Sequence, residues 1–296
     1  MRLVTHNGSF HVDEILSFLI LRKIYPNYTL VRTRDPKEFE KGGIIFDVGG
    51  QYSPSRDIYD HHFNDTPKRL TGEKYSSAGL IWKHFGMDYL FKITTPSEKL
   101  WDIIDNRIFR WIDIVDNGEI SGLPKFCITI QHMINSFIPN WDSDESFDDA
   151  FLKAADWLEI WLDNEIGKFI GQIKAETEVL NDFSNSEYSH VLYMDQFKPW
   201  QKTIFDHDIV KHIDYVIYYD KPNDDYKIQC VPPYEGSFEQ KRPLPKSWAG
   251  LRGQELSDIV GVEMVFCHPG RFIGGFKYKK DIPHILNKIE EEIWQK

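Results

Sequence analysis

The sequence predicts an α/β protein in which an N-terminal parallel sheet and a smaller C-terminal α/β domain are joined by a long helix. Strand-like runs at 2–6, 28–33 and 44–48, with an apolar helical face at 11–25, follow one another in strand–helix–strand–strand order. This order is typical of a parallel sheet covered by helices. A second series of short strands begins near residue 190, beyond the long helical stretch.

The long helix separates the two predicted domains. It begins at the acidic segment 142–149, whose carboxylates complement a helix N-terminus, and we expect it to reach about Leu180. The chain is therefore divided into an N-terminal domain, a linker helix and a C-terminal α/β domain, at 1–140, 141–183 and 184–296.

Shorter elements are predicted between these landmarks. A helix is expected at 76–86, with Ser76 as its cap and Gly86 as its end. Two further helices are expected at 96–115 and 127–137. The C-terminal strands are expected at 190–194, 215–219, 226–231, 263–267 and 272–276, with helices near 200–205, 254–260 and 282–294.

Composition excludes several classes of protein. Hydrophobic residues at 41% and aromatic residues at 15% are ample for a folded core. The net charge of −11 argues against a protein that coats nucleic acid or membranes by bulk charge, although a local basic groove stays open. The cysteines Cys127, Cys230 and Cys267 form no C-x-x-C pair, which favours a reducing compartment. Because no uncharged apolar run approaches the ~20 residues that span a bilayer, we expect a cytoplasmic protein without a membrane partner.

Histidine and aspartate side chains gather where the predicted N-terminal strands end. His6, His11 and Asp13 follow the first strand, Asp47 ends the third, and Asp60-His61-His62 comes shortly after. In open α/β sheets, ligands bind at the carboxyl ends of the strands. Carboxylate and imidazole donors suit Mn, Fe, Zn or Mg, so the pattern predicts a metal site. Each residue alone also fits loop hydrogen bonding or a turn cap, and it is the conjunction of separated elements that favours the metal.

Two other stretches are candidates for substrate binding. The window 241–280 carries eight Lys or Arg residues, among them Arg252 and Arg271, against three acidic residues. Within it, the pair Gly274-Gly275 could expose backbone N–H groups to an anion; the alternative is a tight turn with solvated lysines. The small residues after Ser76-Ser77 could likewise let the backbone approach a ligand, or simply open a capped helix.

Several motifs resemble one known superfamily. Asp47-Val48-Gly49-Gly50 and Asp60-His61-His62 are similar to elements of the DHH phosphoesterases. The stretch from Thr5 to Glu14 more closely resembles one branch, the melanocyte-proliferating-gene family, and the likeness spans nearly the whole chain. It continues through Val31-Arg32-Thr33-Arg34-Asp35-Pro36, Ser76-Ser77-Ala78-Gly79, Asp113-x-x-Asp116-Asn117-Gly118, Arg242-Pro243-Leu244-Pro245 and Phe272-Ile273-Gly274-Gly275.

This resemblance implies a metal-dependent phosphodiesterase, with 3′–5′ RNA exonuclease activity described among eukaryotic members. It implies metal ligation by a set of five residues, namely His6, Asp13, Asp47, His61 and Asp116. His62 would lie beside the scissile phosphate, and Asp60 would orient its neighbours. The pattern His6-x4-His11-x-Asp13 departs from the superfamily's His-x3-Asp-x-Asp. His11 stands in place of an aspartate, and as a neutral ligand it would lower the negative charge of the site.

The resulting hypothesis is phosphodiester hydrolysis with two Mn²⁺ ions, or Mg²⁺, bridged by Asp47. His62 would donate a proton to the leaving oxygen or hold a non-bridging one. Phosphates of an RNA or short-oligonucleotide substrate would be gripped by Arg252, Arg271 and Gly274-Gly275. A homodimer stays open. One alternative is the same chemistry on pyrophosphate or another small phosphoester, and another is a protein that binds metal and RNA without catalysis.

Overall fold

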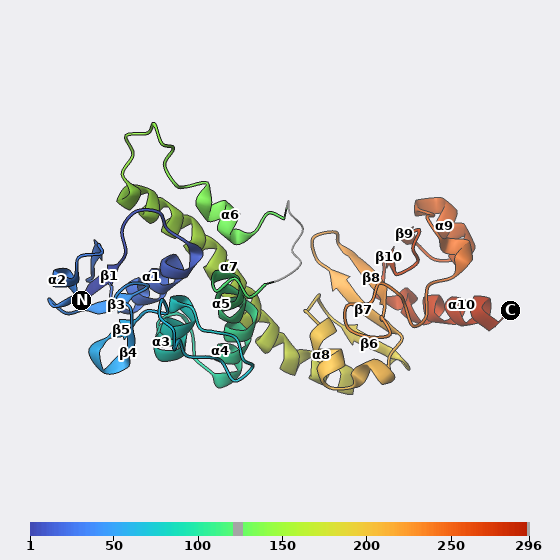
Figure 1. Cartoon of the computed structure of the whole chain (residues 1–296). Coiled ribbons are helices and arrows are strands. Elements are labelled where there is room, and N and C mark those ends of the chain that lie inside the picture. Colours follow the sequence, from blue (N-terminus) through green and yellow to red (C-terminus); the bar gives the residue numbers. More distant parts are fainter. Residues whose placement is uncertain (121–126, 295–296) are drawn as a thin grey trace. The chain divides into compact units, whose positions relative to one another are not determined.

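The computed structural model describes residues 1–120 and 127–294 and shows a mixed α/β fold with two five-stranded sheets (Figure 1). The chain divides into two compact units, Met1–Ile170 and Gly171–Lys296. The division falls inside the long helix α7, Phe147–Ser184. The mixed α/β class is confirmed, and each unit is described by itself below.

The sheet of the first unit has the strand order β2-β1-β3-β5-β4. Its members are β1 (Arg2–Thr5), β2 (Thr29–Arg32), β3 (Ile44–Phe46), β4 (Tyr52–Ser53) and β5 (Ile58–Tyr59). All neighbouring pairs are parallel except β4 with β5. The parallel sheet was predicted, whereas β4 and β5 were not, because two residues are too few to show an alternating pattern.

Helix α1 (Val12–Ile24) packs against α3 (Ser77–Ile93). Ten consecutive residues of α1, Val12–Leu21, are buried, which explains why its apolar face in the sequence is so broad. On the sheet, Val4, Ile45 and Ile58 form a buried cluster across three neighbouring strands. The remaining helices of the unit are α2 (Pro36–Phe39), α4 (Glu98–Ile104), α5 (Arg110–Asp116) and α6 (Ile130–Asn135), with a 3-10 turn at Pro54–Arg56.

The predicted end of a helix at Gly86 is wrong, because α3 continues through this residue to Ile93. A Cβ atom at Gly86 would lie 2.6 Å from Nε1 of Trp101 and 2.8 Å from the ring of Trp82. The glycine therefore lets two indole rings approach the helix backbone, and it serves packing here rather than termination.

The single helix predicted at 96–115 consists of three consecutive helical elements. A π-helical turn, Asp105–Phe109, lies between α4 and α5. Asp105 on this turn and Asp113 on α5 both bind Arg69, whose side chain is only 6% exposed. Nη1 and Nη2 of Arg69 lie 2.5 and 3.0 Å from the two Asp105 oxygen atoms, and Nε lies 2.5 Å from Asp113 Oδ2. Asp113 Oδ1 in turn accepts a hydrogen bond from the Ser76 N–H at the start of α3.

The sheet of the second unit has the order β6-β7-β8-β10-β9 and is antiparallel except for the pair β6 and β7. Its strands are β6 (Val191–Met194), β7 (Tyr215–Asp220), β8 (Asp225–Cys230), β9 (Met264–Cys267) and β10 (Ile273–Phe276). Its helices are α8 (Gln201–Asp206), α9 (Gly253–Val260) and α10 (Ile282–Trp294), with 3-10 turns at Ile209–Lys211, Lys246–Trp248 and Lys279–Asp281.

Side chains of alternate residues of β7 pack into two separate hydrophobic cores in this unit. Tyr215 and Ile217 pack with residues of α9 and α10, while Val216 and Tyr218 pack with residues of α8 and of the end of α7. Both faces of the sheet are therefore covered by helices.

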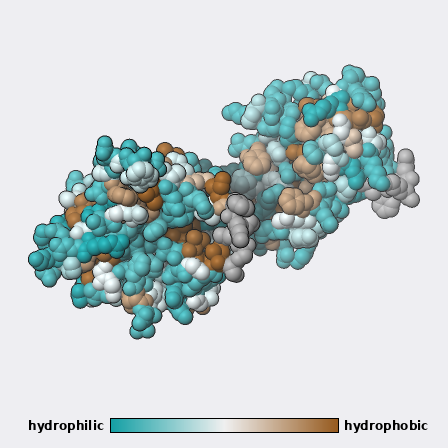
Figure 2. Space-filling view, turned by 45° about the horizontal axis from the view of Figure 1, so that its top comes forward, coloured by the Kyte–Doolittle hydropathy of each residue, from teal (hydrophilic) through white to brown (hydrophobic). Residues whose placement is uncertain are grey.

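On the surface in Figure 2, hydrophobic residues are scattered among a majority of hydrophilic ones. Within the described residues, no helix combines the length and the apolar character that crossing a membrane requires.

We predict that Arg69→Met lowers the stability of the first unit by about 3–5 kcal/mol, because it leaves two buried carboxylates without their cation. The matched control is Lys153→Met, whose side chain is 65% exposed. Its ion pair with Glu145 should contribute less than about 1 kcal/mol. Urea unfolding of both variants measures the difference. Equal losses would contradict a structural role for the Arg69 network.

Candidate metal centre

Three neighbouring parallel strands end at one edge of the first sheet and bring the predicted ligands together. His6 directly follows β1, Asp47 follows β3, and Asp60-His61-His62 follows β5. Because β1, β3 and β5 are adjacent in the sheet, their carboxyl ends lie side by side. Asp47 has a φ angle of +56°, a left-handed conformation that few residues other than Gly, Asn and Asp adopt readily. The convergence expected from the sequence is therefore present in the fold.

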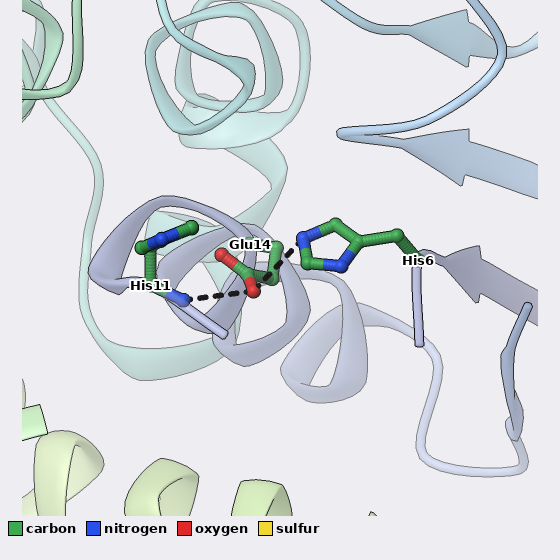
Figure 3. Close-up of side chains that lie close together, drawn as sticks. All are labelled: His6, His11 and Glu14. Carbon is green, nitrogen blue, oxygen red and sulfur yellow. Dashed lines mark hydrogen bonds and ion pairs between the residues drawn. The ribbon is translucent and has the colours of Figure 1, made fainter. Parts of the chain in front are cut away.

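His6, His11 and Glu14, together with Oδ2 of Asp47, form what we call the first donor group. Nε2 of His6 lies 3.1 Å from Glu14 Oε1 and 3.2 Å from Asp47 Oδ2. The backbone N–H of His11 donates a hydrogen bond of 2.8 Å to the same Glu14 oxygen. Figure 3 shows Glu14 between the rings of His6 and His11. One ligand atom from each of His6, His11 and Glu14 lies within 4.8 Å of the others, close enough to share an ion.

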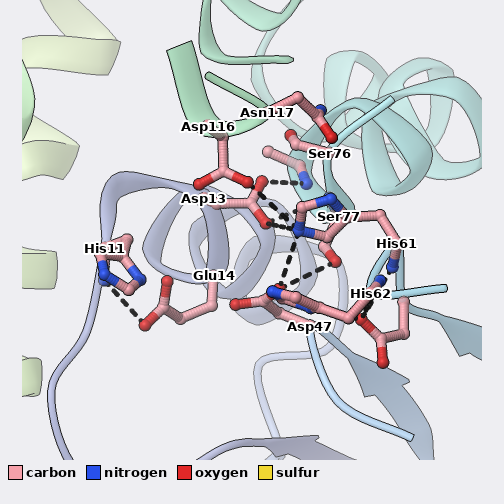
Figure 4. A network of polar contacts seen from close by, with 12 residues as sticks. His11, Asp13, Glu14, Asp47, His61, His62, Ser76, Ser77, Asp116 and Asn117 are labelled. Atoms are coloured by element: carbon pink, nitrogen blue, oxygen red, sulfur yellow. Dashed lines mark hydrogen bonds and ion pairs between the residues drawn. The ribbon is translucent and has the colours of Figure 1, made fainter. Parts of the chain in front are cut away.

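Asp13, His61 and Asp116, together with Oδ1 of Asp47, form the second donor group (Figure 4). Nε2 of His61 lies 3.2 Å from Asp116 Oδ2, 3.4 Å from Asp47 Oδ1 and 3.8 Å from Asp13 Oδ2. Asp47 thus presents one carboxylate oxygen to each donor group. This is the geometry that a bridging ligand requires.

The N-terminus of α3 holds Asp13 in place. The N–H groups of Ser77 and Ala78 donate hydrogen bonds of 3.1 and 2.6 Å to its two carboxylate oxygens. Backbone N–H groups at a helix N-terminus commonly bind anions in this way. Oγ of Ser77 also donates to Asp47 Oδ1 at 3.3 Å. Ser76 and Ser77 are both fully buried. The two serines therefore have internal hydrogen-bond partners, and the substrate contact predicted for them stays a prediction.

Asp60 orients its two neighbours, as the resemblance implies. Its Oδ2 accepts a hydrogen bond of 2.6 Å from the Gly50 N–H, and its Oδ1 accepts one of 2.7 Å from the His61 N–H. Oδ1 also lies 2.9 Å from Nδ1 of His62. Burial raises the pKa of Asp60, but these hydrogen bonds outweigh it and lower the pKa overall. The His62 side chain is 62% exposed and reaches solvent from this anchored position.

The residues present fit a divalent cation. Within the described part of the chain, Glu14 Oε2 and His61 Nε2 are buried without a hydrogen-bond partner, one in each donor group. Ligands bound at about 2.0–2.2 Å and roughly 90–110° apart lie about 3.0–3.5 Å from one another, which matches most of the N···O distances above. Imidazole and carboxylate donors together suit Mn²⁺, Fe²⁺, Zn²⁺ or Mg²⁺.

The clustered carboxylates of the two donor groups also favour a positive charge among them. Burial lowers the pKa of His6, but the carboxylates of Asp47 and Glu14 outweigh it and raise that pKa to about 10. The pKa of His61 is likewise raised to about 10, because Asp47, Asp13 and Asp116 outweigh the effect of burial. Burial and the neighbouring carboxylates raise the pKa of Asp13. The clustered acids are compensated by protons on imidazole when no other cation is present.

Glu14 is the donor that the sequence analysis missed. It stands beside Asp13, which the sequence analysis did single out, and adjacent helical residues point in different directions. Three residues after His11, it also matches a capping box, and its side chain does bind the His11 N–H. The first turn of α1 in fact sends Asp13 to one donor group and Glu14 to the other.

The predicted substrate-binding residues of the second unit lie in different local settings. Arg252 is exposed, with its guanidinium 5.8 Å from the ring centroid of Phe266. Arg271 is partly buried, and its Nη1 donates to the backbone carbonyl of Leu244 at 3.0 Å.

The turn considered at Gly274-Gly275 is wrong, because both residues lie inside β10 and pair with β8 and β9. A Cβ atom at Gly275 would lie 2.9 Å from the ring of Phe266. This glycine therefore makes room for an aromatic ring on the neighbouring strand, and anion binding at Gly274-Gly275 stays a prediction.

We predict that binding of Mn²⁺ to the first unit releases protons. His6 and His61 carry protons below a pH of about 10 in the metal-free protein, and an imidazole nitrogen must be unprotonated to bind an ion. Raising the pH from about 7 to about 9 should therefore strengthen binding, by about tenfold per pH unit for each proton released. Calorimetry in buffers of different ionisation enthalpy counts the protons. An affinity that does not change with pH would contradict the assignment.

Comparisons with known proteins agree on one family. The family model MYG1_exonuc, described as "Uncharacterised protein family (UPF0160)", matches residues 2–288. The MYG1 protein C694.04c of Schizosaccharomyces pombe is 32% identical over 304 residues, which cover 93% of each chain. The MYG1 protein YER156C of Saccharomyces cerevisiae is 32% identical over 95% of this chain and 93% of its own. The human MYG1 exonuclease is 30% identical over 94% of this chain and 83% of its own. The chain therefore belongs to the MYG1 family, UPF0160.

Proposed function

We propose that this protein is a metal-dependent phosphodiester hydrolase of the DHH type, a 3′–5′ exonuclease that acts on RNA with two divalent ions. The observation that supports it most directly is Asp47, which faces one donor group with each of its carboxylate oxygens. The relatives from human, rat and cattle, which are named MYG1 exonuclease, support nuclease chemistry independently. Mn²⁺ is the proposed ion, with Mg²⁺ as the alternative.

The ions, when bound, would activate a water molecule and neutralise charge on the attacked phosphate. The chain supplies the rigid frame: Asp13 is fixed by two amide groups of α3, and Asp47 by its place at the end of a buried strand. His62 is placed to move a proton. Because Asp60 holds Nδ1 of His62, Nε2 is the nitrogen that would face the leaving oxygen. The hydrogen bond to Asp60 raises the His62 pKa, which favours the proton-donating form.

Substrate length is the open choice within this chemistry. The net charge of −11 favours short oligonucleotides or small phosphoesters over long RNA, because a polymer must run along an acidic surface. The exposed Arg252 and the partly buried Arg271 are the proposed contacts for substrate phosphates in the second unit. A basic contact surface of this kind would favour the longer substrate.

The deciding experiment follows end-labelled RNA and DNA of several lengths with Mn²⁺, Mg²⁺ or a chelator. We expect a ladder of shortened RNA from the 3′ end that requires metal and is lost in Asp47→Ala. The matched control is Asp156→Ala, an exposed aspartate outside both donor groups. Cleavage of short or small phosphoesters alone would replace the RNA exonuclease with the small-substrate hydrolase. Tight metal and RNA binding without turnover of any phosphoester would contradict an enzyme altogether.

We predict that His62→Ala lowers kcat by about 10²–10⁴-fold, the contribution typical of a general acid, with little change in Michaelis constant. Because the side chain is 62% exposed, the substitution should leave the melting temperature unchanged. The control is His84→Ala, which removes an exposed histidine from α3. A His62→Ala variant with full kcat would rule out the proton-donating role.

A further inference from the structure

The two donor groups differ in chemical composition. Around their shared Asp47, the first contains two imidazoles and one further carboxylate, from His6, His11 and Glu14. The second contains one imidazole and two further carboxylates, from His61, Asp13 and Asp116. Nδ1 of His62 also lies 3.4 Å from Asp47 Oδ1, but we do not count it as a donor because Asp60 Oδ1 holds the same nitrogen at 2.9 Å. The first is therefore the richer in nitrogen, and the second carries one more negative charge.

Glu14 is what makes the first group a complete set of donors. Its side chain is fully buried, and Oε1 is fixed by the His11 N–H at 2.8 Å and faces Nε2 of His6 at 3.1 Å. Among the described residues, nothing donates a hydrogen bond to its other oxygen, Oε2. A buried carboxylate oxygen in this position needs a cation or a donor. The rings of His6 and His11, with centroids 6.4 Å apart, flank the same space.

Asp13 cannot substitute for Glu14 in this group. Two N–H groups of α3 fix its carboxylate beside the second group, where its nearest imidazole is His61, whose Nε2 lies 3.8 Å from Asp13 Oδ2. The position of each acid on the first turn of α1 therefore commits it to one side of Asp47. The assignment of the two acids is thus built into the backbone of α1, whereas the second imidazole of the first group comes from the exposed side chain of His11.

Nitrogen-rich and oxygen-rich sites select different metals. Imidazole favours ions late in the first transition series, such as Zn²⁺, whereas carboxylate-rich sites suit the harder Mn²⁺ and Mg²⁺. We propose that the protein holds two unlike divalent ions, with Glu14 as a ligand of a Zn²⁺-selective first position and Mn²⁺ retained at the second. This rests on the proposed two-ion centre and adds which ion each position prefers.

The test titrates the metal-free full-length chain with Mn²⁺ and follows free Mn²⁺ by electron paramagnetic resonance, without substrate. Two Mn²⁺ ions should bind, and the first equivalent of Zn²⁺ should then displace one of them, while displacement of the other requires an excess of more than about tenfold. Displacement of both ions in equal proportion by the first equivalent would overturn the proposal.

Variants assign the two positions. Glu14→Gln keeps an oxygen for the His11 N–H and should weaken the Zn²⁺-selective position by more than about tenfold while the other Mn²⁺ stays bound. Asp116→Asn should do the reverse, and Glu98→Gln, an exposed glutamate on α4, should change neither. Circular dichroism and melting temperature check folding, and Glu14→Asp, a shorter carboxylate, repeats the test if Glu14→Gln is unstable. Unchanged Zn²⁺ binding in folded Glu14 variants would remove Glu14 as a ligand.

The metal-binding test and the nuclease assay can fail independently of each other. Two unlike ions bound to a protein that cleaves no phosphoester would overturn the enzymatic function and leave this inference standing. An active nuclease that binds two equivalent ions would overturn this inference and leave the proposed enzymatic function standing.

Discussion

The burial of several carboxylates at one sheet edge is the constraint on which the rest of the first unit depends. Asp13, Glu14 and Asp47 are almost fully buried, and Asp116 stands beside them. The pKa of Asp13 is raised first by its burial and further by repulsion from the carboxylates of Asp116 and Asp47. Amides of α3 and the imidazoles of His6 and His61 offset part of this charge, and the orphaned atoms of both donor groups mark where a cation completes the balance.

A second layer of buried polar contacts keeps these acids in place. Arg69 joins Asp105 on the π-helical turn to Asp113 on α5, and Asp113 accepts a hydrogen bond from the N–H of Ser76, the N-cap residue of α3. A Cβ atom at Gly79 would lie 2.2 Å from Asp113 Oδ1, so only glycine allows this approach. The amides that hold Asp13 are therefore positioned by a network that touches none of the metal-binding atoms, and a site on such rigid elements is preorganised for its ion.

The same charge balance bears on the proposed chemistry. A phosphate group would be repelled by the metal-free cluster, and the whole protein has a net charge of −11. Two divalent cations in the donor groups would neutralise the four carboxylates, and under the proposed function substrate affinity would then depend on metal binding. His62 stands at the rim, exposed to solvent but anchored through Asp60, where a proton can pass between bulk water and the cluster.

Much of this was determined by the sequence alone. Buried strands ending in His6 and Asp47, and the run Asp60-His61-His62, predicted the parallel sheet and the gathering of possible metal ligands at its edge, because neighbouring parallel strands present their carboxyl ends together. The amphipathic and acidic patterns likewise predicted α1 and α7.

Tertiary structure decided the rest. The two-residue strands β4 and β5 carry no periodicity, and Gly86 and Gly275 give no sign in the sequence that they make room for aromatic rings. Glu14 was not singled out in the sequence, and only the fold shows that Asp13 and Glu14 belong to different donor groups on the two sides of Asp47. Local patterns report a residue's own backbone preference, whereas ligand sets and close contacts depend on segments distant in the chain.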